Sequence, residues 1–261
     1  MHHTPALVLI AHGSRDPRHA ATVRELMAGV RALRPGVRTE VGFLDFDAPS
    51  VPDTLARLAA DGVTDAVAVP LLLTRAFHAK SDIPGVLAEA AVRHPGLRVR
   101  QAGVLGPSPL LRTALERRLY EAGLTPADRP STGIVLASAG STDPEAIAVI
   151  ASVAREWRRT GWCAVRPAFA SASLPRTEDA VRALRADGVR RVAVAPYVIA
   201  PGRLPDRIAA GAAEADVLAE VLGAAPELAA LVVRRYEDAV APASGHPLRR
   251  GRGPLSRAAP R

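Results

Sequence analysis

Three side chains in the first half of the chain are of types that could hold a divalent metal ion. They are His12 in LIAHGSRDP, Asp45 in GFLDFDAPS and His78 in PLLLTRAFHAKSDIP. Two neutral imidazoles beside a carboxylate make a suitable open site for a borderline metal such as Fe²⁺, Co²⁺ or Ni²⁺. The three residues are distant in sequence, so this chemistry depends on a fold that brings them together.

Hydrophobic patterning predicts the elements that would position them. Apolar, β-branched runs alternate with amphipathic segments along the chain, which indicates an α/β fold with mostly parallel sheets flanked by helices. We expect strands near residues 6–11, 39–45, 65–73, 98–104, 132–138, 163–169, 190–199 and 217–222. We expect helices near residues 17–34, 50–61, 82–93, 108–122, 143–159, 175–187, 204–215 and 226–239.

Each of the three candidate residues follows the carboxyl end of an expected strand. His12 closes the first strand, Asp45 closes the second and His78 comes after the third. Ligands of open parallel sheets bind in the crevice outside these ends. We therefore expect the three side chains to converge in space.

The chain contains an internal duplication. LIAHGSRDP at 9–17 matches LASAGSTDP at 136–144, RLAADGVTDAVAVP at 57–70 matches ALRADGVRRVAVAP at 183–196, and the segment at 104–123 is echoed at 221–240. Three matches in the same order predict two tandem, similar lobes, each with a four-stranded sheet. We expect a catalytic lobe at 1–124, a linker at 125–131, a degenerate repeat lobe at 132–240 and a basic disordered tail at 241–261.

The two copies agree in one turn and differ in the residues that carry chemistry. The shared residues are Gly13, Ser14, Asp16 and Pro17, which recur as Gly140, Ser141, Asp143 and Pro144. They fit a strand-to-helix turn in which Asp caps the helix and Pro is its first residue. The counterparts of His12, Asp45 and His78 are Ala139, Ser171, and Arg203 with Leu204. The site is therefore predicted in the first copy alone.

Structural interpretations of these residues compete with the functional ones. A single histidine at a strand end is often hydrogen-bonded for structural reasons, and an aspartate there often caps the next turn, as the neighbouring Asp47 could also do. His19 and His94 lie on expected helices and are predicted to face solvent.

Composition narrows the classes of function. Cys163 is the only cysteine, which excludes a disulfide framework and a cysteine-based metal site and agrees with a reducing compartment. No uncharged stretch approaches the roughly 20 apolar residues of a membrane span. The net charge is +8, but five arginines and no acid follow Val240, and aromatic residues make up 3% of the chain. Nucleic-acid binding is poorly supported, so we expect a cytoplasmic protein that binds neither nucleic acid nor membrane.

The segments VLIAHGSRDP, FLDFDAPSVPDTL and VPLLLTRAFHAKSDIP together resemble the sirohydrochlorin chelatases, the class II chelatases of sirohaem and cobalamin biosynthesis. The resemblance is strong over about residues 6–123 and extends over 132–240 as the degenerate lobe of two-lobed members. It implies a lyase that inserts Fe²⁺ or Co²⁺, and sometimes Ni²⁺, into sirohydrochlorin held between the lobes. The metal ion is then a substrate, and no other cofactor is implied.

The same resemblance implies roles for individual residues. His12 and His78 would bind the metal and accept protons, because insertion removes two pyrrole protons and needs a base with a pKa near neutrality. Asp45 stands, one methylene shorter, where the family has Glu in Phe-Leu-Glu. The residues that would contact the substrate and its carboxylates are Ser14, Arg15, Arg18, Arg75 and Lys80.

Other functions fit the motifs less well, with one exception. A histidine phosphatase would carry Arg-His-Gly after the first strand, and here Ala11 precedes His12. A dinucleotide oxidoreductase would need a glycine fingerprint that HGSRDPR lacks. A non-catalytic carrier of the metal or the tetrapyrrole would keep the same two histidines, so this alternative stays open. A two-lobed chain could make its own cleft, so a monomer would suffice.

Overall fold

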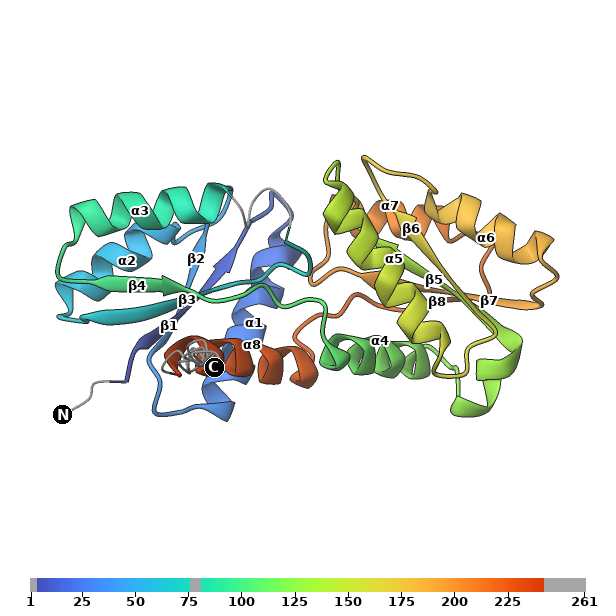
Figure 1. Ribbon diagram of the computed structural model, residues 1–261, viewed down its shortest axis with the longest axis horizontal. Helices are drawn as coiled ribbons and strands as arrows, with labels where there is room; N and C mark the ends of the chain where they lie inside the picture. The colour runs from blue at the N-terminus through green and yellow to red at the C-terminus, as the bar shows by residue number, and fades with distance from the viewer. Residues whose placement is uncertain (1–3, 76–80, 242–261) are drawn as a thin grey trace, which may run out of the picture.

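Two α/β lobes lie side by side along the long axis of the molecule (Figure 1). The computed structural model describes residues 4–75 and 81–241. The fold class expected from the sequence is confirmed: two four-stranded parallel sheets are flanked by helices. No helix in the described part of the chain is both long and apolar enough to cross a membrane.

The first sheet has the strand order β2-β1-β3-β4, and all its pairings are parallel. Its strands are β1 (Ala6–Ala11), β2 (Thr39–Phe43), β3 (Asp65–Pro70) and β4 (Arg98–Gln101). The helices of this half of the chain are α1 (Pro17–Leu33), α2 (Val51–Ala60), α3 (Ile83–Arg93) and α4 (Pro109–Glu121).

The second sheet repeats this topology in the order β6-β5-β7-β8. Its strands are β5 (Thr132–Ser138), β6 (Ala164–Phe169), β7 (Arg191–Tyr197) and β8 (Val217–Leu218). The helices are α5 (Pro144–Arg158), α6 (Thr177–Ala186), α7 (Arg203–Gly211) and α8 (Pro226–Val240). A 3-10 helix, η2 (Pro126–Ser131), fills most of the expected linker.

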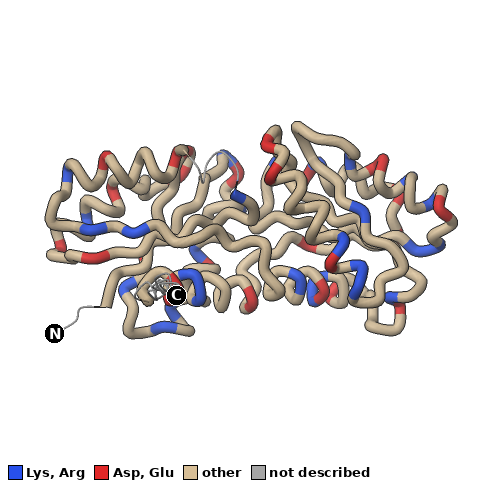
Figure 2. The backbone as a smooth tube through the Cα atoms, in the orientation of Figure 1, with Lys and Arg blue, Asp and Glu red and all other residues tan. Residues whose placement is uncertain are grey.

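The central strands are apolar at nearly every position because helices cover both faces of each sheet. All six residues of β1 are buried, and its alternate side chains enter two different hydrophobic clusters. Figure 2 shows charged residues mainly along the helices and connecting turns, whereas β1 and β5 carry none. The alternation of side chains along β1 therefore decides which of the two hydrophobic clusters each side chain enters.

The last helix of each repeat packs against the other lobe. Helix α8 contacts α1 and β3 of the first lobe, whereas α4 contacts β7 of the second, and the two helices pack against each other (Figure 1). The Tyr236 hydroxyl of α8 donates to the Pro5 carbonyl at 2.7 Å, and Arg235 Nε donates to the Val104 carbonyl at 2.8 Å. One hydrophobic cluster therefore runs through both lobes. The limits 1–124 and 132–240 follow the repeats along the chain, and as domain limits they stay a prediction.

Several elements are shorter than the sequence suggested. Strand β3 ends at Pro70 rather than near 73, β4 ends at Gln101 rather than near 104, and β8 spans only Val217–Leu218. Helix α7 ends at Gly211 instead of near 215. After Pro70, the Leu71 N–H still donates to the Ile10 carbonyl at 2.8 Å, but β1 ends at Ala11, so Leu72 and Leu73 lie beyond the end of this neighbouring strand.

Candidate functional site

A cavity of about 630 Å³ lies between the lobes, where the carboxyl ends of both sheets face each other. Its first wall comes from the turns after β1, β2 and β3 with part of α1, and its second wall from the turns after β5 and β7 with parts of β6, α5 and α7. Leu71, Leu72 and Leu73 line this cavity, which explains their apolar character without a strand. In open α/β sheets, ligands bind beside the carboxyl ends of the strands where the strand order reverses, and in both sheets of this protein these ends border the same cavity.

The turn after β1 is held in the same way as its counterpart after β5. In the first copy the Ser14 hydroxyl accepts the Asp16 N–H at 3.1 Å, and Asp16 Oδ1 accepts the Arg18 N–H at 2.9 Å. In the second copy the Ser141 hydroxyl accepts the Asp143 N–H at 3.0 Å. The recurring residues therefore build a helix-capping turn, and Ser14, which also lines the cavity, is fixed within it.

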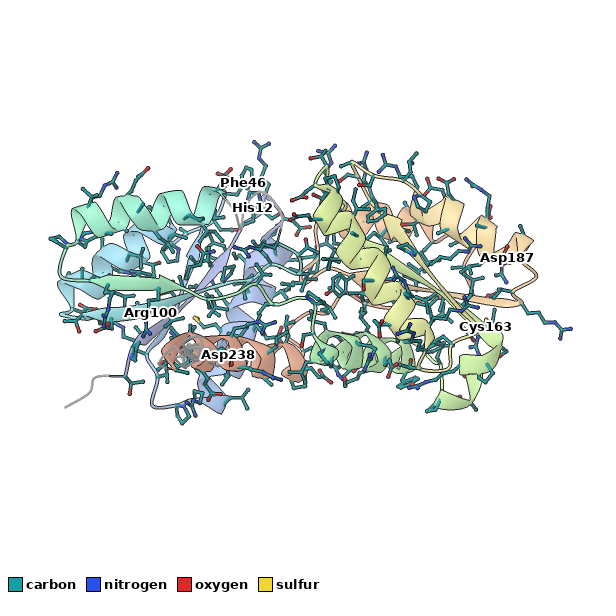
Figure 3. The ribbon with its side chains drawn as sticks, in the orientation of Figure 1. His12, Phe46, Arg100, Cys163, Asp187 and Asp238 are labelled. Carbon is teal, nitrogen blue, oxygen red and sulfur yellow. The ribbon has the colours of Figure 1, made fainter. Side chains whose placement is uncertain are left out.

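His12 is the first residue after β1, and its side chain lines the cavity. Its ring lies edge-on to Phe46, with ring centroids 6.2 Å apart, and Figure 3 places both residues at the edge of the first lobe nearest the second. The His12 carbonyl accepts the Asp45 N–H at 2.9 Å, which ties the turn after β2 to the histidine. The imidazole is thus presented to the cavity from a fixed backbone.

Asp45 lies in the adjacent turn but does not line the cavity. It is exposed, and its Oδ1 accepts the N–H of Phe46 at 2.8 Å. The carboxylate that contacts cavity residues is that of Asp47, whose Oδ2 accepts the Ser14 N–H at 3.0 Å and lies 3.9 Å from His19 Nδ1. A catalytic role for Asp45 stays a prediction. The Asp47 side chain bonds the turn after β1 rather than capping the turn after its own strand, which was the role considered for it from the sequence.

Phe46 is a cavity residue that the sequence did not single out. It has a positive φ of 62°, and the residue is 52% exposed although its side chain is a large apolar group. Ala172, its counterpart, has the same backbone conformation with φ of 59°. Non-glycine residues adopt this region at a cost. The first copy alone places an aromatic ring there, and the comparison of Phe46 with Ala172 could have revealed it.

The structure corrects the expectation that His19 faces solvent. Its side chain is only 19% exposed and lines the cavity, with Nδ1 buried 3.9 Å from Asp47 Oδ2. Nδ1 has no hydrogen-bond partner among the described residues. Burial holds the pKa of His19 below its ordinary value, although Asp47 acts in the opposite direction. Its counterpart in the second copy is Ala146, which also lines the cavity. The comparison of the two copies, which selected His12 because its counterpart is an alanine, would therefore also have selected His19.

Of the three predicted substrate-binding arginines, one lines the cavity and two do not. Arg15 lines the cavity, and its guanidinium lies 5.3 Å from the Phe46 ring centroid. Arg18 is paired with Asp16 at 2.5 Å and with Asp206 of the second lobe at 3.3 Å. Arg75 is exposed and does not line the cavity.

Two predicted residues, His78 and Lys80, lie outside the described residues. Within residues 4–75 and 81–241, no group of three or more His, Cys, Asp or Glu side chains is arranged to hold a metal ion.

The second lobe supplies a mostly apolar wall. Its contribution includes Ile147, Ile150, Phe169, Val198 and Ile199. Tyr197 adds a hydroxyl that is buried without a partner in the described part of the chain, and burial raises the pKa of this phenol. Such a wall can cover the face of a large, flat organic molecule while the first lobe presents the reactive groups.

Comparison with solved structures shows that this fold is shared. SirB from Bacillus subtilis with Fe³⁺ has a TM-score of 0.78 at 23% identity, covering 92% of this chain and 96% of SirB. CbiX, the terminal enzyme for biosynthesis of siroheme in denitrifying bacteria, has a TM-score of 0.68 at 20% identity, covering 90% of this chain and 100% of CbiX.

Similar sequences belong to proteins of one activity class. A sirohydrochlorin cobaltochelatase of Priestia megaterium is 27% identical over 212 residues, 79% of this chain and 68% of the relative. A sirohydrochlorin ferrochelatase of Bacillus subtilis (strain 168) is 26% identical over 206 residues, 78% of this chain and 77% of the relative. The CbiX family model matches twice, over residues 6–122 and 133–239, in agreement with the duplication. The chain belongs to the CbiX family of sirohydrochlorin chelatases.

Proposed function

We propose that this protein inserts Fe²⁺ or Co²⁺ into sirohydrochlorin within the cavity between its lobes, as a step of sirohaem or cobalamin biosynthesis. The observation that carries the proposal is the position of His12, at the carboxyl end of β1 and in the cavity wall, where the second copy has Ala139. Relatives named for cobalt and for iron match the chain equally well in extent. The proposal therefore includes both metals, and Ni²⁺ remains a third to be assayed.

Metal insertion is an exchange of protons for a cation. Two pyrrole N–H bonds break, four metal–nitrogen bonds form, and two protons leave, without a change in oxidation state. The site must therefore hold the metal weakly and accept protons near neutral pH, and histidine serves both needs. We assign these roles to His12 and His78 and keep Asp45 as a third, acidic member of the catalytic group. Ser14, Arg15, Arg18, Arg75 and Lys80 are proposed as substrate contacts.

The walls of the cavity suit the two kinds of surface that this substrate has. The macrocycle is flat and apolar, and the second lobe offers aliphatic side chains together with Phe169. The edge carries carboxylates, for which Arg15 offers a guanidinium beside the Phe46 ring. Both walls come from one chain, so we propose that the monomer is active. We also propose that it acts in the cytoplasm.

Turnover is the test of this function. The purified protein is incubated without oxygen with metal-free sirohydrochlorin in excess over enzyme and with Fe²⁺, Co²⁺ or Ni²⁺. We expect the absorption spectrum to convert to that of the metal complex over many turnovers and faster than in the absence of protein. A protein that binds metal or tetrapyrrole but converts no more than one equivalent would contradict catalysis and support the carrier function instead.

A further inference from the structure

Two arginines from different lobes lie at the same rim of the cavity. Arg15 belongs to the turn after β1, and Arg203 is the first residue of α7. Both line the main cavity and also a neighbouring open hollow. Neither makes a salt bridge to any residue of 4–75 or 81–241, and Arg15 has only the Phe46 ring near its guanidinium.

The two turns that carry these arginines lie close together. A Cβ added at Gly202, the residue before Arg203, would lie 3.7 Å from Ser14 Oγ, the residue before Arg15. Arg18 of α1 also reaches Asp206 of α7 at 3.3 Å across the same seam. The seam between α1 and α7 therefore brings both guanidinium groups to one side of the cavity.

The acidic residues of this seam are already occupied. The neighbouring hollow is lined by Asp16 and Asp206, and both of these carboxylates pair with Arg18. Arg207 lies in the same hollow, and among the described residues its guanidinium makes only a long contact, 3.5 Å, to the Ala170 carbonyl. The rim therefore carries uncompensated positive charge, which favours an anionic ligand, and guanidinium groups bind carboxylates in a planar, two-point manner.

Neither rim arginine is repeated at the corresponding position of the other copy. The segment of the first copy that contains His78 corresponds to the segment of the second copy that contains Arg203. Arg15 corresponds to Thr142. Arg203 itself aligns with Phe77, so each of the two arginines stands at a position where the other copy has an uncharged residue, and the two arginines meet at one rim.

We propose that Arg15 and Arg203 together form a carboxylate-binding subsite for two neighbouring acid groups on the edge of the macrocycle. The inference rests on the proposed function, because it specifies which part of the substrate the second lobe recognises. The degenerate lobe then selects tetrapyrroles that carry free acids, in addition to covering the face of the ring.

The test is the affinity for metal-free sirohydrochlorin, measured by absorbance titration without metal, so that binding is separated from insertion. Arg15→Gln and Arg203→Gln are compared with wild type and with Arg190→Gln. Arg190 is an exposed arginine that lines neither the main cavity nor the neighbouring hollow and precedes β7, at the opposite end of the same sheet. We expect each rim variant to raise Kd about tenfold or more, as for loss of a hydrogen bond to a charged group, and Arg190→Gln to leave it unchanged.

A second ligand isolates the carboxylates. The methyl ester of the same macrocycle lacks the negative charges, so wild type and both rim variants are expected to bind it with equal, weak affinity. In insertion assays the rim variants should raise KM while kcat changes less than about twofold, since the arginines do not touch the reacting nitrogens. Arg203→Lys keeps the charge without the planar fork and should fall between wild type and Arg203→Gln.

The outcomes separate this inference from the proposed function. Wild type that binds sirohydrochlorin but does not insert metal would overturn the function. Wild type that inserts metal, with rim variants that bind as tightly as Arg190→Gln or lose kcat alone, would overturn the subsite. Equal discrimination between acid and ester by wild type and Arg203→Gln would also overturn it.

Discussion

The substitution Gly13→Ala tests how the turn after β1 supports His12. Gly13 has φ of +94°, and an added Cβ would lie 1.8 Å from the Asp45 carbonyl oxygen and 2.9 Å from its carbon. The second copy repeats this geometry: Gly140 has φ of +93°, and its Cβ would lie 1.9 Å from the Ser171 carbonyl oxygen. The two glycines therefore form a matched pair, one beside His12 and one beside Ala139.

The cost to stability follows from two effects. A left-handed backbone conformation costs an L-residue roughly 1–2 kcal/mol. Relief of the clash requires the opposing turn to retreat, and such overpacking costs roughly 1–3 kcal/mol. We expect each alanine variant to lose about 2–5 kcal/mol of unfolding free energy, and the two losses to be similar.

The cost to activity should differ between the pair. Retreat of the turn after β2 displaces Phe46 in the cavity and Asp47, which holds the Ser14 N–H. Misplacement by about 1 Å can cost roughly a hundredfold in rate, so kcat/KM of Gly13→Ala should fall at least about tenfold further than that of Gly140→Ala. Urea denaturation and initial insertion rates on folded protein provide the two measurements. Loss of less than about 0.5 kcal/mol in Gly13→Ala, or equal activity losses in both variants, would refute the reasoning.

Two further predictions concern stability. Glu116 accepts the Trp157 indole N–H at 2.9 Å and Arg129 Nη2 at 3.0 Å. Glu116→Ala removes the acceptor of the buried Trp157 indole, whereas Arg129 keeps its bonds to the Tyr120 hydroxyl and the Thr160 carbonyl. The loss should cost about 1–3 kcal/mol by urea denaturation; an unchanged midpoint would contradict it. The second prediction concerns His19, because burial lowers the pKa of its imidazole in the folded protein. Above the unfolded-state pKa of about 6.5, the imidazole is neutral in both the folded and the unfolded state. Below that pH the unfolded state binds the proton more readily, which favours unfolding. Wild type should therefore lose stability relative to His19→Ala between pH 7.5 and 5.5, and a constant difference in midpoint would refute the burial argument.

The alternation of elements and the duplication were predictable because they depend on local patterns. Strands buried on both faces read as continuous apolar runs, as in β1, and a helix that covers a sheet has an amphipathic period. The capping turn was predictable for the same reason, since Asp16 and Pro17 act within their own helix. The order of strands within each sheet was not predicted, because right-handed parallel connections allow several orders.

Contacts between the lobes were not predictable from such patterns. The apolar faces of α4 and α8 indicate that each covers a sheet, but not that each covers the sheet of the other lobe. The burial of His19 comes from a segment that is distant in sequence, since Asp47 lies 3.9 Å from its Nδ1 and the Phe43 ring 6.5 Å from its own, and a local pattern carries no signal for such contacts either. The apolar run at Leu71–73 reads as strand because burial between lobes and burial within a sheet give the same composition.

The central claim is that a single site in the first lobe, at His12, performs metal insertion. The most direct measurement is the initial rate of sirohydrochlorin metallation by His12→Ala beside His94→Ala, with wild type as reference. His94 ends α3 and precedes β4, so it lies at the other end of the first sheet from the cavity. The account predicts that His12→Ala loses most of the rate, by about a hundredfold or more, while His94→Ala keeps it. Equal rates in the two variants would contradict the account.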